Sequence, residues 1–261
     1  MTMDGLRVFH PTELTPECTQ AFCHAVRVAV MGNNTLTLMH VREWGDDEVD
    51  EKFPSPEELL ERWAIEGTSL EVERVRSRGE DVVRELLGYL DLQPVHLLVL
   101  PTRGRKGFDA WFSGSVAEPV ARLSKAMTLF VRHGCRGFVD EATGAVSLDH
   151  ILVPVTRTPS PEPALQGALD LAATLGASEA RITTCYVGDP ADAPLVGDYP
   201  LVIRQGPPAE AITALARELR ADLIAMTTEG RQGVLDALRG STTERVVRDA
   251  PCPVLAVPTA R

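Results

Sequence analysis

Residues Asp222–Pro258 read DLIAMTTEGRQGVLDALRGSTTERVVRDAPCPVLAVP, and this stretch decides the fold. Its first apolar run, Leu223–Met226, predicts a buried strand, and Val254–Val257 predicts another. A segment with three glycines lies between them, and Gly240–Thr242 begins a helix that ends before Pro251. A strand, a glycine loop and a helix start in this order are typical of phosphate binding, because unpaired backbone N–H groups and the helix dipole both favour an anion there.

A second stretch, His96–Val131, repeats this pattern in the first half of the chain. It contains an apolar run, a glycine-containing loop and the start of a helix in the same order. In each stretch nine residues separate the glycine of a Gly-Arg pair from the glycine of a Gly-Ser pair. These pairs are Gly104-Arg105 with Gly114-Ser115, and Gly230-Arg231 with Gly240-Ser241. Two copies of one spaced motif indicate an internal repeat.

The composition limits the classes of protein to which this chain can belong. Its 261 residues suit one large or two ordinary domains, and 44% hydrophobic residues with 5% aromatics predict aliphatic cores. The net charge of −11 argues against nucleic acid or an anionic membrane as the main partner. Five scattered cysteines indicate reduced thiols and a cytoplasmic location rather than a disulfide framework. No apolar run has transmembrane length or the character of a signal segment.

Apolar runs and amphipathic segments alternate along the whole chain. Strands are expected at residues 6–10, 35–41, 70–75, 95–100 and 127–131, and again at 151–155, 181–187, 201–204, 223–226 and 254–257. Helices are expected between them, one of them capped at its start by Thr15 and another covering residues 54–66. The alternation predicts an α/β fold with two tandem five-stranded, mainly parallel sheets and helices on both faces.

A connector at about residues 134–148 separates the two copies. Its middle, Gly137–Val146, predicts a small hairpin around a Glu-Ala-Thr-Gly turn. We therefore expect one domain at residues 1–146 and a second at 147–261. The segment from the end of the second strand to the helix after the third strand is shorter in the second copy, 19 residues (Val187 to Gly206) against 38 (Val41 to Gly79). The second domain is thus expected to lack the helix that follows the second strand of the first.

These features resemble the universal stress protein family, with two such domains in one chain. The resemblance covers nearly the whole sequence and is strongest in ADLIAM, GRQG and GSTTERVVRDAPCPVLAVP near its end. It implies a Rossmann-like fold similar to that of the adenine nucleotide α-hydrolases. Members of the family commonly dimerise through the fifth strand. Met127–Val131 and Val254–Val257 are therefore expected to pair within the chain as a pseudo-dimer, and a further homodimer stays open.

In nucleotide-binding members, a Gly-x2-Gly-x9-Gly-[Ser/Thr] motif holds the phosphates of ATP. An acidic residue follows the first strand, and main-chain groups after the second strand receive the adenine. Carried over to this sequence, the resemblance implies ATP as the ligand, alone or with Mg²⁺. The implied contacts in the first copy are Pro11, Thr12, Glu13, Val41, Thr102, Gly104, Arg105, Gly114, Ser115 and Val116. Those in the second copy are Pro154, Val155, Thr156, Thr228, Gly230, Arg231, Gly240, Ser241 and Thr242.

Both copies depart from that motif at its first glycine, which is Pro101 in one copy and Thr227 in the other. Proline has no N–H, and neither residue has the conformational freedom of glycine. The acidic position is Glu13 in the first copy but Thr156 in the second, so a single functional site is expected in the first copy, with His10 beside it. The second copy stays open as the site, because Thr227 is a milder replacement than Pro101 and its Gly-Arg-Gln-Gly loop matches the family more closely. The alternative for both loops is a tight strand-to-helix connection that holds no ligand.

The leading functional hypothesis is a cytoplasmic stress-response protein that binds ATP or a related adenine nucleotide as a regulatory ligand. The sequence contains no Ser-His-Asp or Cys-His arrangement and no zinc-spaced cysteines, so neither a catalytic residue nor a metal site is predicted. Two alternatives remain. One is a scaffold that docks an unidentified protein partner without nucleotide. The other is an enzyme on the same fold, such as a slow ATP hydrolase or a nucleotidyl transferase.

Overall fold

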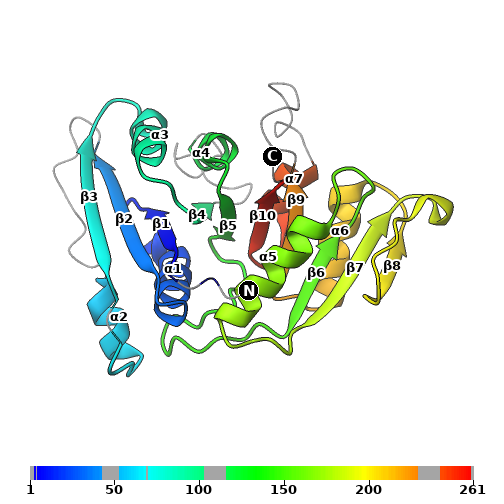
Figure 1. The fold of residues 1–261 in the computed structure, drawn as a ribbon, viewed down its shortest axis with the longest axis horizontal. Helices are drawn as coiled ribbons and strands as arrows, with labels where there is room; N and C mark the ends of the chain where they lie inside the picture. The colour runs from blue at the N-terminus through cyan, green and yellow to red at the C-terminus, as the bar shows by residue number, and fades with distance from the viewer. Residues whose placement is uncertain are drawn as a thin grey trace.

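The computed structural model describes residues 3, 5–42, 53–68, 70–102, 116–228 and 242–259. Both glycine loops and the acidic segment after residue 42 lie outside these ranges. The described strands and helices alternate as the sequence predicts, and Figure 1 shows them spread along one sheet.

The first half has five strands, β1 (Arg7–Pro11), β2 (Thr35–Arg42), β3 (Val72–Arg78), β4 (Leu97–Thr102) and β5 (Met127–Arg132). Its α-helices are α1 (Thr19–Met31), α2 (Pro56–Arg62), α3 (Val82–Leu92) and α4 (Ala117–Ser124). The second half has β6 (His150–Pro154), β7 (Arg181–Val187), β8 (Leu201–Arg204), β9 (Leu223–Thr228) and β10 (Val254–Pro258). Its α-helices are α5 (Glu162–Thr174), α6 (Pro208–Glu218) and α7 (Thr242–Asp249), and only a three-residue 3-10 helix, Pro190–Asp192, lies between β7 and β8.

The two expected sheets are joined into one ten-stranded sheet, in the order β3-β2-β1-β4-β5-β10-β9-β6-β7-β8. Every neighbouring pair is parallel except β5 and β10, which are antiparallel and pair Val254 with Phe130, Leu255 with Leu129 and Ala256 with Thr128. Outward from the β5–β10 pair, equivalent strands of the two halves follow in the same order, β4-β1-β2-β3 on one side and β9-β6-β7-β8 on the other, as Figure 1 shows. The α/β class and the expected pairing of the two fifth strands are both confirmed.

Each face of the sheet carries one apolar core, and both cores run through both halves. One core contains residues of α1 and α5 together with Leu129 of β5 and Leu255 of β10. The other contains residues of α3, α4, α6 and α7 on the opposite face. Because side chains alternate across a strand, Val8 of β1 lies in the first core and Phe9 in the second. The halves are therefore covered by shared cores rather than by separate ones.

Three local expectations differ from the structure or are refined by it. The strand expected at 70–75 is β3 at Val72–Arg78, because β2 continues to Arg42 and its register pairs Arg42 with Arg78. Thr15 precedes a 3-10 helix, Pro16–Cys18, and its hydroxyl lies 3.7 Å from the Cys18 thiol instead of capping α1. The helix expected at 54–66 is α2, which Ser55 and Glu58 start with a reciprocal capping box.

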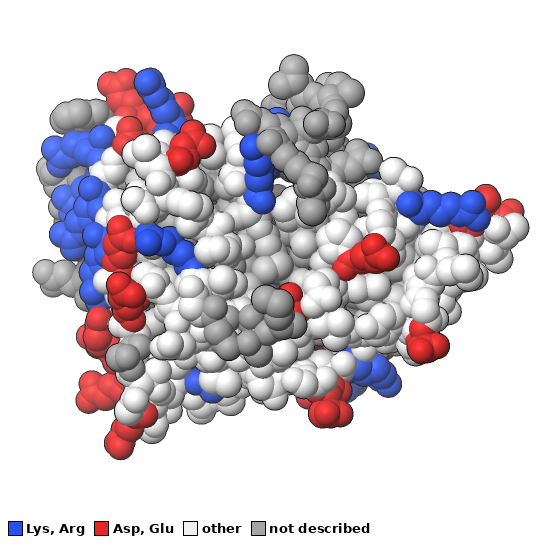
Figure 2. All heavy atoms as spheres, in the orientation of Figure 1, with Lys and Arg blue, Asp and Glu red and all other residues white. Residues whose placement is uncertain are grey.

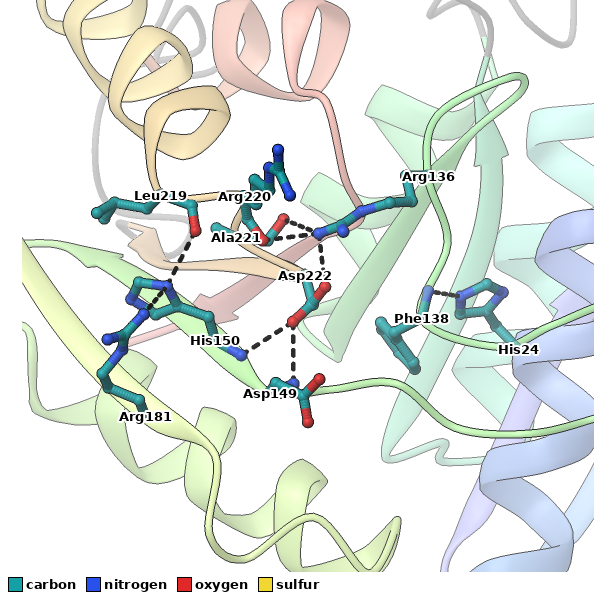
Figure 3. Close-up of polar contacts among 10 residues, drawn as sticks. All are labelled: His24, Arg136, Phe138, Asp149, His150, Arg181, Leu219, Arg220, Ala221 and Asp222. Atoms are coloured by element: carbon teal, nitrogen blue, oxygen red, sulfur yellow. Dashed lines mark hydrogen bonds and ion pairs between the residues drawn. The ribbon is translucent and has the colours of Figure 1, made fainter.

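The connector between β5 and β6 forms hydrogen bonds with both halves. Arg136 donates from its backbone N–H to Pro251 O (3.0 Å) and from its guanidinium to Arg220 O (2.7 Å) and to the Asp222 carboxylate (2.6 Å). The second oxygen of Asp222 accepts from the N–H groups of Asp149 and His150, both at 2.9 Å. Figure 3 shows Asp222 at the centre of these contacts, between the connector and the start of β6. Both oxygens of the nearly buried Asp222 carboxylate thus accept hydrogen bonds, one of them from a guanidinium.

On the side of the first half, the connector contacts α1 and the end of α2. His24 donates from Nδ1 to Gln20 O (2.7 Å), so its Nε2 carries a lone pair and accepts from Phe138 N at 3.1 Å. A turn follows, in which Val139 and Val146 form one antiparallel bridge. At this turn Trp63 donates from Nε1 to Glu141 O at 3.1 Å.

Gly144 gives a test of how tightly the connector packs on Trp63. It has a φ of 67°, and a Cβ at this position would lie 2.4 Å from the indole ring. We expect Gly144→Ala to lower the free energy of unfolding by about 2–4 kcal/mol, because left-handed backbone strain and overpacking add. Gly67→Ala is the control, since Gly67 has a φ of 73° but no atom within 4 Å of its Cβ position. Urea titrations showing equal losses for both variants would contradict the contact.

We expect the free energy of unfolding to fall in mild acid because of the buried His24. Burial lowers the pKa of His24 to about 4 from its ordinary 6.5, so the unfolded chain takes up the proton first as the pH falls. This contribution to stability is complete above pH 6.5 and is lost as the pH falls through 4. It amounts to about 3 kcal/mol. His24→Gln keeps an acceptor for Phe138 N and should flatten the decline, measured as unfolding free energy between pH 8 and 4. The exposed His133→Gln is the control, and parallel curves for all three proteins would refute the assignment.

Candidate functional site

The strand order predicts a crevice at the carboxyl ends of β1 and β4, the topological switch point of the first half. The chain leaves β1 through α1 to reach β2 on one side, and it returns through α3 to reach β4 on the other side. Connections that depart in opposite directions leave an opening between the two strand ends, where ligands of open α/β sheets bind. In the second half the equivalent opening lies between β6 and β9.

The chain that leaves β1 is fixed by β2. Thr12 is buried; its N–H donates to Met39 O (3.0 Å), and its carbonyl accepts from His40 Nδ1 (2.8 Å). The Thr12 hydroxyl then accepts from the N–H of Leu14 (3.0 Å), which has a φ of 59°. This short turn ends the strand abruptly, and it places the half-buried Glu13 beside the opening.

Two buried polar atoms at these strand ends have no hydrogen-bond partner among the described residues: Nε2 of His10 and the hydroxyl of Thr102. His10 is fully buried and donates from Nδ1 to Val99 O (2.8 Å), so its Nε2 is an acceptor. Burial lowers the pKa of His10 to about 4, which keeps the ring neutral near pH 7. Thr102 is 7% exposed. An unpaired buried polar group costs about 1–3 kcal/mol, so each atom is suited to a partner from outside the described chain.

His10 Nε2 and the Thr102 hydroxyl lie at a different end of the strands from the other buried atoms that have no hydrogen bond. The other buried side-chain atoms without a hydrogen bond in the described residues belong to Arg27, Tyr89, Arg122 and Arg248, and Arg122 Nε lies 3.7 Å from the Glu118 carboxylate. All four residues lie in the later turns of helices, which meet the amino ends of the strands in a β-α-β connection. His10 and Thr102 are therefore the two that lie at the carboxyl edge of the sheet.

In the described part of the second crevice, the first turn of α5 is bonded within the chain. Helix α5 begins Pro161-Glu162-Pro163-Ala164, and its two prolines have no N–H to offer. The N–H of Glu162 donates to Ser160 Oγ (3.4 Å), and that of Ala164 donates to Thr227 Oγ1 (3.2 Å). Thr227 thus fills the position of the expected motif glycine with a hydroxyl that caps α5. The first turn of this helix has no N–H left for an anion.

A further contact spans the same opening. Arg157, just after β6, donates from Nε to Asp192 O (3.0 Å) in the 3-10 helix after β7. Thr156 is exposed, and its hydroxyl donates to Pro159 O (3.0 Å). The loop after β6 therefore has one hydrogen bond within itself and one to the segment between β7 and β8. The prolines of α5 are the sequence signal that could have indicated this arrangement, whereas the Thr227 and His40 contacts leave no local signal.

The expected site residues fall into three groups. Pro11, Thr12, Glu13, Thr102 and Val116 lie around the first crevice, and Val41 lies one strand away in β2. Pro154, Val155, Thr156, Thr228 and Thr242 lie at the corresponding ends of β6, β9 and α7. Eight expected contacts lie outside the described residues, namely Gly104, Arg105, Gly114, Ser115, Gly230, Arg231, Gly240 and Ser241.

The cysteines are buried and poorly suited to nucleophilic chemistry. All five are free thiols inside the cores. Burial raises the pKa of Cys23 to about 12 and that of Cys135 and Cys185 to about 11, and it raises those of Cys18 and Cys252 as well. The reactive thiolate is therefore disfavoured near neutral pH. The described part of the chain also has no group of three His, Cys, Asp or Glu side chains placed to hold a metal ion.

Comparison with known proteins adds the family to this geometry. Two relatives match short segments. A universal stress protein of Methanocaldococcus jannaschii is 47% identical over 53 residues, 20% of this chain and 31% of that protein. One of Thermus aquaticus is 48% identical over 56 residues, 22% of this chain and 41% of the relative. The chain thus matches less than half the length of these relatives. In the described ranges, no helix is long and apolar enough to cross a membrane.

Two solved structures match the fold over nearly the whole chain. A universal stress protein of Archaeoglobus fulgidus has a TM-score of 0.67 at 19% identity, covering 99% of this chain and 98% of its own. A functionally unknown protein of Pseudomonas aeruginosa has a TM-score of 0.68 at 15% identity, covering 98% and 94%. The model of the universal stress protein family matches residues 7–132 and 191–258, well over half of the sequence. This chain belongs to the universal stress protein family.

Proposed function

We propose that this protein binds one adenine nucleotide per chain, with ATP as the leading candidate, in the crevice between β1 and β4. The bound nucleotide would act as a regulatory ligand in a stress response. The observation that carries the proposal is the pair of unpaired, buried polar atoms, His10 Nε2 and Thr102 Oγ1, at these strand ends. A nucleotide offers amino and hydroxyl donors as well as acceptors, so it can pair groups that the described chain leaves unpaired.

The remaining roles follow from the family resemblance and the placement of the residues. Backbone groups near Val41 would receive the adenine, and Glu13 would face the ribose or a Mg²⁺ ion. The phosphates would meet the loop that contains Gly104, Arg105 and Gly114. His40 would act as a positioning residue, because its hydrogen bond to Thr12 O fixes the turn that carries Glu13.

The second crevice would stay empty in the same molecule. Two contacts support this: Arg157 Nε donates to Asp192 O across the opening, and the Thr227 hydroxyl accepts from the N–H of Ala164, so these groups are already bonded within the chain. The second half would then serve to complete the sheet and the two cores. This assignment makes one nucleotide per chain the expected stoichiometry.

Turnover of the nucleotide is not part of this proposal. The titratable groups named for the first crevice are Glu13 and His10, and burial lowers the pKa of His10 to about 4, which makes its ring a weak general base. Hydrolysis would therefore be slow. The rival function is a scaffold that needs no nucleotide, and the observation in its favour is Pro101, which removes a backbone N–H where the family motif has glycine.

Isothermal titration of the intact chain with ATP and Mg²⁺ tests the site and its stoichiometry. We expect one nucleotide per chain. Gly114→Arg should abolish binding, since a bulky cation replaces the glycine of the first loop, whereas Gly240→Arg should leave it unchanged. The intact chain is required because the two halves share both cores. No binding heat up to millimolar ATP would favour the scaffold, and loss with Gly240→Arg alone would move the site to the second crevice.

A matched pair of threonines tests the role of the unpaired hydroxyl. Thr102→Val keeps the shape of the side chain, so it should weaken nucleotide binding about fivefold, the equivalent of ~1 kcal/mol for one hydrogen bond. Without nucleotide, the same change should leave the stability unaltered or higher, because an unpaired buried hydroxyl is removed. Thr228→Val, at the corresponding end of β9, is the control and should leave the affinity unchanged. Equal affinities for both variants would show that the Thr102 hydroxyl does not contact the ligand.

A further inference from the structure

The outermost strand of the first half, β3, has a free side in the described structure. It lies at one end of the sheet order and pairs with β2 alone. An edge strand presents main-chain N–H and C=O groups that another extended segment can bond. Its seven residues, VERVRSR, give this edge the length of an ordinary strand.

Arginines occupy one face of β3 in a regular row. Arg74, Arg76 and Arg78 are all exposed and alternate along the strand, so they point to the same face. The register places Arg76 beside His40 and Arg78 beside Arg42, which widens the row into β2. Figure 2 shows blue side chains gathered along the left edge of the molecule, where Figure 1 places β3. A basic row of this kind contrasts with a chain whose net charge is −11.

The charges in this row are only partly neutralised. Arg74 forms a bidentate ion pair with Glu57 of α2, with both carboxylate oxygens at 2.7 Å. No acidic partner lies within ion-pair distance of Arg42 or Arg76 among the described residues. The middle of the row is therefore the part that is open to an external carboxylate.

The other face of β3 differs in chemistry. Glu73 is paired with Arg7 (2.9 Å), and Ser77 donates to Glu85 of α3. Between them Val75 is half-buried and packs against the core on that face. A strand added to this edge would thus lie beside arginines on one face. On the other face it would lie beside Val75, whose polar neighbours Glu73 and Ser77 are already bonded.

We propose that the β3 edge is a docking site for an extended acidic segment of a partner protein. The segment carries Asp or Glu at alternate positions and apolar residues between them, and it adds to the sheet beside β3. Alternate side chains of two neighbouring strands have the same spacing, about 6.6 Å, so a carboxylate in the middle of the segment can meet Arg76 while its neighbours follow the row. Main-chain hydrogen bonds supply the rest of the recognition.

Charge and backbone chemistry favour this occupant over two others. A second copy of β3, paired antiparallel and in register, would place arginine opposite arginine, which is destabilising. A nucleic acid could meet the arginines with its phosphates, but it has no peptide groups to continue the sheet. The inference is independent of nucleotide binding, because β2 and β1 separate the arginines of β3 from the crevice between β1 and β4.

A labelled seven-residue peptide, with glutamates alternating with valines, tests the proposal by fluorescence anisotropy on the intact protein at low salt. We expect binding that weakens as salt screens the charges. Arg76→Glu should lower the affinity at least about fivefold, because it replaces an attraction by a repulsion. Arg245→Glu, an exposed change of the same charge on α7, should leave it unchanged. Arg76 and Arg245 are both exposed, and thermal melts would check that both variants are folded.

Three control ligands separate strand addition from simple charge attraction. A peptide of the same composition with contiguous glutamates, and the alternating peptide with methylated backbone nitrogens, should both bind weakly. The proposal is overturned if either binds as well as the parent peptide, or if a single-stranded oligonucleotide binds better. It is also overturned if Arg76→Glu has no effect. If the peptide binds only after the acids of residues 43–51 are changed to amides, the occupant is the chain's own segment and not a partner.

Discussion

The antiparallel pairing of β5 with β10 is the contact on which the rest of the structure depends. It involves three residue pairs, and its backbone hydrogen bonds contribute only about 0.5–1.5 kcal/mol each. Its larger effect is geometric. By aligning two five-stranded sheets edge to edge, it lets α1 and α5 cover one continuous face and four other helices cover the opposite face. Apolar burial along these two faces then stabilises both halves together.

The connector adds specific polar contacts to this arrangement. Arg136 and Asp222 tie it to the second half, and His24 and Trp63 tie it to the first. At the N-terminus, Met3 donates to the Thr174 hydroxyl at the end of α5 (2.7 Å), which links the halves a second time. These contacts are ion pairs and hydrogen bonds in partly or fully buried positions, so they favour one relative orientation of the halves rather than adding much apolar burial.

The sequence was sufficient to predict the alternation of strands and helices and the repeat, because these depend on local periodicity and on a spaced motif. The pairing of the fifth strands was implied by the family resemblance. The sequence was less reliable where a distant partner decides the outcome. The limits of β3 follow from the length of β2, and the hydroxyl of Thr227 caps a helix 63 residues away. The unpaired state of His10 Nε2 depends on packing from several elements, which no local pattern encodes. The glycine loops, where the resemblance is strongest, lie outside the described residues.

The start of α5 shows what a covalent tandem permits. In a dimer of identical chains, two prolines and a capping threonine at one crevice would appear at both, and any ligand site there would be lost twice. A fused pair can alter one copy and keep the other. If only the first half holds a nucleotide, as proposed, that nucleotide has no equivalent neighbour in the chain with which to be coupled. Occupancy would then follow a simple hyperbola, which gives a graded response to nucleotide concentration instead of a threshold.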